Sequence, residues 1–146
     1  MSHKLTVLIL CTGNSCRSQM AEALVNHDLG PQIHAISAGI RPQPKVADGA
    51  IAALQQAGIA VTGLHPKDVD TLMHEAIDLV ITVCDNAKEA CPIFPRPIPS
   101  VHLPFHDPHG EPLESFVRVM QQIRAELVPE VARRLGVMQV NLGASK

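Results

Sequence analysis

The chain has 146 residues, 46% of them hydrophobic and 18% charged, which is typical of one globular domain and excludes a disordered chain. The formal net charge is −2, without the basic excess of nucleic-acid binders, and no apolar run is long enough to span a membrane. The apolar stretch near the N-terminus is too short for a secretory signal, so we expect a cytoplasmic protein that contacts neither nucleic acid nor membrane.

The first predicted element is a strand over residues 4–10, a continuous apolar run of the kind that is buried on both faces. The strand ends at Cys11. Small polar residues then lead to a predicted helix over residues 18–29, which Gly30 ends. A strand, a short polar loop and a helix N-terminus together form a frame suited to binding anions.

The rest of the chain continues the alternation of strands and helices. A bend is expected at Pro129, inside the last helix. The order predicts a single-domain α/β fold, with a four-stranded, mainly parallel sheet flanked by helices. We expect this domain to cover residues 1–136 and residues 137–146 to form a C-terminal tail. The remaining predicted strands are 33–39, 78–84 and 101–105, and the remaining predicted helices are 46–59, 68–76 and 113–135.

The loop from Cys11 to Ser18 reads CTGNSCRS and has the strongest chemical signal in the sequence. Its backbone N–H groups and the positive end of the following helix predict an oxyanion site, and Gly13 and Asn14 tolerate the left-handed backbone region. Arg17 adds a planar guanidinium that can hold two oxygens at once. Cys11 enters the same positive field, so we predict a thiolate with a lowered pKa. The predicted oxyanion-binding residues are Thr12, Gly13, Asn14, Ser15, Cys16, Arg17 and Ser18.

The chain contains four cysteines, at positions 11, 16, 84 and 91, which in a cytoplasmic protein favour catalysis, redox chemistry or metal binding over structural disulfides. A four-thiolate zinc site is disfavoured, because the six residues between Cys84 and Cys91 exceed the usual spacing of zinc knuckles. Cys16 has no evident chemical role, and we interpret it as structural. A cluster of histidines as metal ligands is also disfavoured, because no scaffold fixes them: His102, His106 and His109.

The stretch CTGNSCRS resembles the phosphate-binding loop of the low-molecular-weight protein tyrosine phosphatase superfamily. The resemblance implies that Cys11 is the nucleophile, that Arg17 holds the oxyanion and that Ser18 hydrogen-bonds to the thiolate. It also implies a general acid, for which Asp107 in the stretch FHDPHG is the matching residue. The alternative for Asp107 is an ordinary turn aspartate before a proline.

Three features distinguish phosphatases from reductases within this superfamily. The chain continues RSQMAEA after the loop, without the proline typical of the phosphatases, and it contains no tyrosine. It also has Cys84 and Cys91 in the stretch ITVCDNAKEACPIFP. In these features, and over nearly the whole chain to about Gly136, it is similar to the thioredoxin-coupled arsenate reductases. Two buried structural thiols are the alternative for the cysteine pair.

The resemblance implies a relay of three cysteines that reduces arsenate for detoxification. Cys11 would attack arsenate while Asp107 protonates the leaving oxygen, and Cys84 would attack Cys11 with release of arsenite. Cys91 would then attack Cys84, and thioredoxin would reduce the resulting disulfide. Phosphate or sulfate would mimic the substrate. We expect a monomer, with weak phosphatase activity on the side.

The resemblance implies no tightly bound cofactor, although some members of the family bind potassium beside the loop. The family often reads HTSD where this chain reads HPKD, so Lys67 offers a positive charge in place of the ion. The residues that match the potassium ligands all have side-chain oxygens, as a hard cation requires: Asn14, Glu22, Ser37 and Asp68.

Two other functions stay open at this point. A phosphatase would hydrolyse an aryl phosphate efficiently and would not need Cys84 or Cys91. A thiol redox sensor would oxidise those two cysteines reversibly without turning over arsenate. The reductant is open as well, since related enzymes use glutaredoxin or mycothiol.

Overall fold

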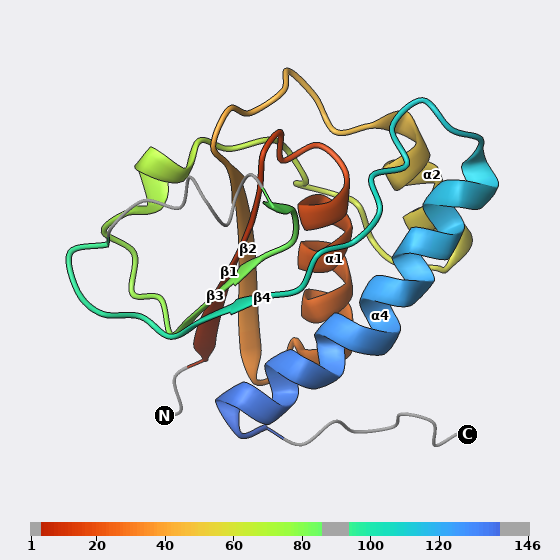
Figure 1. The fold of residues 1–146 in the computed structure, drawn as a ribbon. Coiled ribbons are helices and arrows are strands. Elements are labelled where there is room, and N and C mark those ends of the chain that lie inside the picture. The colour runs from red at the N-terminus through yellow and green to blue at the C-terminus, as the bar shows by residue number, and fades with distance from the viewer. Residues whose placement is uncertain (1–3, 86–93, 138–146) are drawn as a thin grey trace.

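The computed structural model describes residues 4–85 and 94–137, and Figure 1 shows how they are arranged. Cys91 and tail residues 138–146 lie outside the described residues. The elements, in chain order, are β1 (Leu5–Cys11), α1 (Arg17–Leu29), β2 (Ile33–Gly39), α2 (Asp48–Gln56), the 3-10 helix η1 (Val69–Leu72), β3 (Leu79–Thr82), β4 (Ser100–His102) and α4 (Leu113–Leu135).

The four strands form one sheet in the order β2-β1-β3-β4, and all three neighbouring pairs are parallel. The sheet confirms the predicted fold class. β1 has a neighbour on each side, and its residues from Val7 to Leu10 are fully buried, as expected of a parallel strand covered on both faces. Cys11 pairs with Gly39 and Leu10 pairs with Thr82, so β1, β2 and β3 end at the same edge of the sheet.

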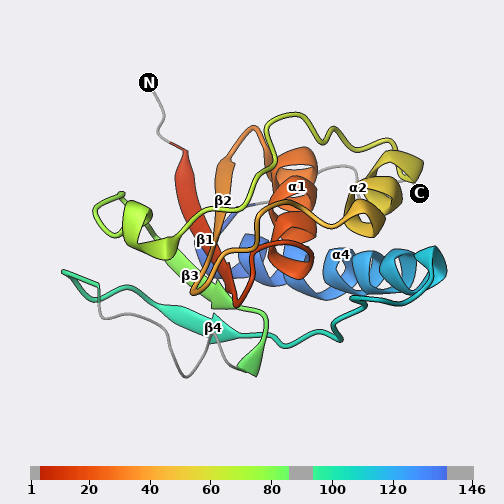
Figure 2. The same cartoon turned by 90° about the horizontal axis from the view of Figure 1, so that it is seen from above.

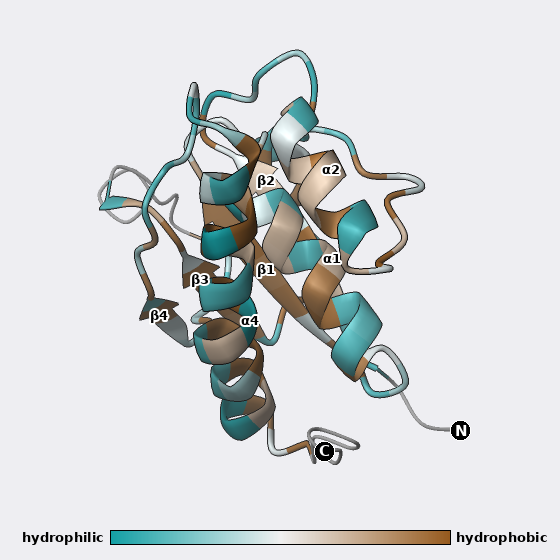
Figure 3. Ribbon diagram, turned by 90° about the vertical axis from the view of Figure 1, so that its right-hand side faces the viewer, coloured by the Kyte–Doolittle hydropathy of each residue, from teal (hydrophilic) through white to brown (hydrophobic). Residues whose placement is uncertain are grey.

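The helices pack beside this sheet and on one another. α1 contacts β1 and β2, α4 lies against α1, and α2 contacts both helices, a grouping visible in Figure 2. Figure 3 shows hydrophobic residues along the strands and alternating polar and hydrophobic bands along α4, the pattern of a helix with one buried face. Within the described residues, no helix combines the length and hydrophobicity needed to cross a membrane.

The structure differs from the predicted elements in several places. The helix predicted over 68–76 is only the 3-10 helix η1, because Val69 is its one buried residue and the Asp68 side chain caps its start. The strand predicted over 78–84 ends at Thr82, so Cys84 lies in the loop that follows. α4 has the predicted bounds and continues across Pro129 without interruption.

An ion pair between a partly exposed arginine and a nearly buried carboxylate joins α1 to α4. Arg124 donates from Nε to Asp28 Oδ2 at 2.8 Å and from an Nη atom to Asp28 Oδ1 at 2.6 Å, and the Asp28 side chain is 9% exposed. Burial raises the pKa of Asp28, but hydrogen bonds from Arg124 and His27 outweigh it, so the net pKa is lowered. The carboxylate therefore stabilises the folded state while it is ionised.

We expect Arg124→Ala to lower the free energy of unfolding by about 2 kcal/mol at neutral pH, because it leaves a buried carboxylate without its charged partner. The folded-state pKa of Asp28 is depressed, so the contribution is present above the unfolded pKa of about 3.9 and is lost as pH falls through the folded pKa. Urea unfolding, followed by circular dichroism at neutral and acidic pH, measures both effects. Lys45→Ala is the control, since Lys45 and its partner Asp48 are exposed and little change is expected.

Candidate active site

The loop between β1 and α1 is held by the chain segment that follows β2. Backbone N–H groups of residues 40–47 donate to the carbonyl oxygens of Cys11, Thr12, Gly13 and Ser15, at 2.8 to 3.2 Å. Because these carbonyl groups point toward that segment, the N–H groups of the same peptides point the opposite way. The loop thus presents backbone donors beside the N-terminus of α1, which is the arrangement predicted for an oxyanion site.

Asn14 is the centre of this loop. Its backbone lies in the left-handed region, with φ of 49°, as the sequence predicted, and its side chain is fully buried. The side-chain amide donates to Ser18 Oγ at 2.8 Å and to Ser37 Oγ at 2.9 Å, and its oxygen accepts from the Lys67 N–H at 2.8 Å. One residue thereby fixes the loop to α1, to β2 and to the segment before η1.

Gly39, at the end of β2, allows this close packing. A Cβ atom at this position would lie 2.8 Å from the Thr12 carbonyl oxygen and 3.0 Å from the Asn14 side chain. Both contacts are shorter than ordinary van der Waals contact, so a larger residue would push the loop away from β2. No local pattern around Gly39 indicated that this glycine supports the loop.

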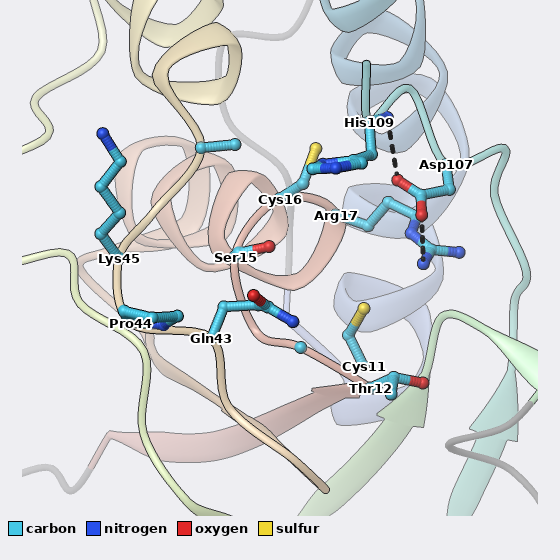
Figure 4. A pocket seen from close by; sticks show the side chains of 12 residues that line it. Cys11, Thr12, Ser15, Cys16, Arg17, Gln43, Pro44, Lys45, Asp107 and His109 are labelled. Atoms are coloured by element: carbon cyan, nitrogen blue, oxygen red, sulfur yellow. Dashed lines mark hydrogen bonds and ion pairs between the residues drawn. The ribbon is translucent and has the colours of Figure 1, made fainter. Parts of the chain in front are cut away.

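A cavity of about 600 Å³ opens above the loop, as Figure 4 shows. The predicted nucleophile, arginine and acid all line it. The sequence analysis did not predict that residues 43–47 and His109 contribute to the lining of the cavity. They could have been expected there in general terms, because the loops at the carboxyl edge of a parallel sheet surround the ligand. The residues that line the cavity are Cys11, Thr12, Gly13, Ser15, Cys16, Arg17, Gln43, Pro44, Lys45, Ala47, Asp107 and His109.

Arg17 and Asp107 meet at the cavity although they lie far apart in sequence. One Nη of Arg17 donates to the Phe105 carbonyl at 3.1 Å, and the other lies 3.5 Å from Asp107 Oδ2. The other carboxylate oxygen of Asp107 accepts from the His109 N–H at 3.1 Å, and half of this side chain is exposed. Arg17 Nε is buried and has no hydrogen-bond partner among the described residues, so the guanidinium retains a donor for a ligand.

Cys84 reaches the same site from the end of β3. Its Sγ lies 3.2 Å from the hydroxyl oxygen of Thr12, the residue directly after Cys11, and the Cys84 thiol is near enough to Cys11 to raise its pKa. Both thiols are buried, and no disulfide joins the described cysteines. The second thiol of the proposed relay therefore lies beside the loop that begins at Cys11.

The hydrogen bond with Cys84 raises the pKa of Cys11, and burial raises it further, whereas Arg17 and the Gly13 N–H act in the opposite direction. The lowered pKa predicted for Cys11 is therefore wrong for this arrangement, because the sequence did not show that a second thiol would share its proton. Burial and the Asp107 carboxylate raise the pKa of Cys16 to about 12, in keeping with its interpretation as structural.

The predicted potassium ligands lie behind the loop. Ser37 Oγ donates to Glu22 Oε1 at 2.6 Å, and the Lys67 ammonium lies 3.4 Å from the same carboxylate oxygen and 3.0 Å from the His65 carbonyl oxygen. The Asp68 carboxylate instead caps the start of η1. Lys67 and Glu22 are only 17% and 14% exposed, so the lysine already neutralises the carboxylate. These residues fit an internal ammonium group and do not fit an added potassium ion.

The histidines considered as metal ligands are separated by their contacts. His102 contacts Thr82 and Asp85, His106 contacts Glu111, and His109 lines the cavity. In the part of the chain that the structure describes, no group of three or more His, Cys, Asp or Glu residues is arranged to hold a metal ion.

Comparisons with known proteins agree with this geometry. Residues 6–135 match the family described as low molecular weight phosphotyrosine protein phosphatase. The curated protein "Arsenate reductase 1" of Bacillus cereus (strain ATCC 10987 / NRS 248) is 39% identical over 127 residues, which cover 87% of this chain and 94% of the relative. An arsenate reductase of Brevibacillus brevis is 38% identical over the same shares.

Among solved structures, the crystal structure of arsenate reductase from Archaeoglobus fulgidus DSM 4304 superposes with a TM-score of 0.74 at 28% identity, covering 86% of this chain and 98% of that one. A structure described as an arsenate reductase in the phosphate binding state gives 0.73 at 27% identity, covering 88% and 98%. The chain therefore belongs to the low molecular weight phosphotyrosine protein phosphatase family, together with proteins that carry the name arsenate reductase.

Proposed function

We propose that this protein reduces arsenate to arsenite. The observation that carries the proposal is a second buried thiol, Cys84, beside the loop of Cys11, while Cys11 lines a cavity together with Arg17 and Asp107. Hydrolysis of a phosphate ester needs one thiol, whereas reduction of an oxyanion needs two electrons, which a pair of thiols supplies when it becomes a disulfide. The names of the curated relatives support the same function.

In the first step, arsenate binds to the loop N–H groups and to Arg17. The Cys11 proton passes to an oxygen of the arsenate dianion, and the thiolate attacks arsenic. Asp107 acts in its protonated form: it gives its proton to the departing hydroxide, which leaves as water, and ends as the carboxylate beside Arg17. Arsenic remains As(V), bonded to Cys11. The positive groups around the cavity stabilise the charge that develops on the oxygens.

In the second step, Cys84 passes its proton to an oxygen on arsenic, and its sulfur attacks the Cys11 sulfur. A bond forms between the two sulfurs, the sulfur–arsenic bond breaks, and its electron pair stays on arsenic. Arsenic is thereby reduced from As(V) to As(III), and each sulfur is oxidised by one electron. Arsenite takes up protons and leaves.

In the last steps, Cys91 attacks Cys84 and frees Cys11. The Cys84–Cys91 disulfide then passes its oxidising equivalents to a dithiol, for which thioredoxin is the proposed reductant. The same cavity admits a small phosphate ester, so we expect weak hydrolysis that uses only Cys11, Arg17 and Asp107. A phosphatase as the main function is not favoured, because the second thiol would then be idle.

Cys84→Ser and Cys91→Ser should each abolish multiple turnover of arsenate, because each breaks the path of the electrons, while slow aryl phosphate hydrolysis at Cys11 persists. The assay is arsenate-dependent NADPH oxidation with thioredoxin and thioredoxin reductase. Efficient hydrolysis without arsenate turnover would indicate a phosphatase. Reversible oxidation of the two cysteines without turnover would indicate a redox sensor.

Cys84→Ala should lower the pKa of Cys11, because it removes the partner that shares the proton, and adding Arg17→Ala should raise it again. Thiolate absorbance against pH, together with the alkylation rate of Cys11, measures the change. An unchanged pKa in Cys84→Ala would show that the two thiols are not coupled in solution.

We also propose that Lys67 acts in place of the potassium ion bound by some relatives. Arsenate turnover should then be equal in potassium and sodium salts at the same ionic strength. Lys67→Met keeps the aliphatic stem but leaves Glu22 without its cation, so it should reduce the free energy of unfolding by about 2 kcal/mol. A potassium-specific rise in activity or stability of the unmutated protein would contradict the proposal.

A further inference from the structure

One histidine bridges the two ends of the short segment that contains Cys84. His102 ends β4, and its Nδ1 lies 2.8 Å from the hydroxyl oxygen of Thr82. Its Nε2 lies 2.8 Å from Asp85 Oδ1. Thr82 precedes Cys84 by two positions and Asp85 follows it directly. The His102 ring therefore contacts one residue before Cys84 and one residue after it.

Backbone hydrogen bonds join the residues before the cysteine to the segment at the end of β4. Thr82 pairs with His102 in the sheet, and the Leu103 and Phe105 N–H groups donate to the carbonyl oxygens of Thr82 and Val83 at 2.9 and 3.1 Å. The contact of His102 with Asp85 extends the connection between the two chain segments past Cys84.

The chemistry of the partners determines which ring nitrogen of His102 donates a hydrogen bond and which accepts one. An ionised carboxylate can only accept, so Nε2 of His102 bears the hydrogen and donates to Asp85. In the neutral ring Nδ1 then accepts from the Thr82 hydroxyl, whose side chain is buried. Both ring nitrogens are occupied, so neither is available to take the proton of Cys84. This excludes a role for His102 as the base that activates the thiol.

The contact between His102 and Asp85 acts mainly by fixing the position of the backbone and contributes little electrostatic stabilisation. The Asp85 side chain is 84% exposed and that of His102 is 21% exposed, so solvent weakens the charge interaction between them. What the bridge supplies is a fixed path for the backbone between residues 82 and 85. Cys84 lies on that path, with its sulfur against Thr12 and Cys11.

We propose that His102 is a positioning residue for Cys84: by joining Thr82 to Asp85, it holds the Cys84 sulfur in place to attack Cys11. The inference rests on the proposed function and concerns only its second step, in which the sulfur–sulfur bond forms and the electron pair of the sulfur–arsenic bond stays on arsenic. Binding of the oxyanion and attack by Cys11 do not involve His102. A misplacement of about 1 Å in such a step can slow it by about 100-fold.

The test separates the two steps in a Cys91→Ser background, where the reaction stops at the Cys11–Cys84 disulfide. One equivalent of arsenate is added, and arsenite release and disulfide formation are followed by rapid quenching and mass spectrometry. Hydrolysis of para-nitrophenyl phosphate reports on Cys11, Arg17 and Asp107 alone. We expect His102→Ala to slow disulfide formation by about 10- to 100-fold and to change hydrolysis by less than about twofold.

Matched variants distinguish positioning from a general loss of structure. Asp85→Asn keeps an acceptor for Nε2 and should retain most of the rate, whereas Asp85→Ala should resemble His102→Ala, and the double variant should be no slower than either. Nitrogen-15 NMR of the ring should show the hydrogen on Nε2, with a changed signal in Asp85→Ala. His34→Ala, which alters an exposed histidine of β2, should leave both steps unchanged.

The outcomes have separate meanings. If His102→Ala leaves disulfide formation unchanged, or slows hydrolysis equally, the positioning role is wrong while the proposed function stands. If the protein with only Cys91→Ser releases no arsenite although it hydrolyses the ester, the proposed function is wrong and the inference is overturned with it.

Discussion

The position of Cys84 beside the loop of Cys11 depends on the parallel pairing of β1 with β3. Because both strands run in the same direction and Leu10 pairs with Thr82, their ends lie side by side at one edge of the sheet. An antiparallel neighbour would have placed its carboxyl end at the opposite edge, far from the loop. Cys11 and Cys84, which are 73 positions apart in the sequence, are thus brought to the same edge of the sheet, and the chemistry of the site follows from sheet topology.

Hydrogen bonds near the same edge of the sheet hold the loop from Cys11 to Ser18 in place. Asn14 hydrogen-bonds to α1, to β2 and to the segment before η1, and the Lys67–Glu22 pair lies directly behind it. A buried polar group of this kind is stable only when its hydrogen bonds are satisfied, so each partner helps to fix the others. The loop is therefore rigid on its inner side, while its donors face the cavity.

Much of the fold and of the candidate site could be predicted, because short stretches of the sequence determine these elements locally. The apolar run before Cys11, the small residues of the loop and the hydrophobic stripe of α4 each specify an element and its position. What could not be predicted depends on contacts between distant segments. The pKa of Cys11 is raised, not lowered as expected, in part because Cys84 lies at the end of the neighbouring strand, far away in sequence. Residues 40–47 hold the loop through backbone hydrogen bonds, which no side-chain pattern in the sequence indicates. The helix expected over 68–76 failed for a related reason: only Val69 finds a buried environment.

The raised pKa of Cys11 has a consequence for survival of the protein under oxidative stress. Peroxides attack thiolates far faster than thiols, and irreversible oxidation of a nucleophilic cysteine ends its usefulness. A nucleophile that remains protonated beside a second thiol until an anion enters the cavity is a poor target for such oxidants. In the proposed mechanism, Cys11 would thus stay protonated while the cavity is empty, and an arriving anion would form the reactive thiolate by accepting the proton.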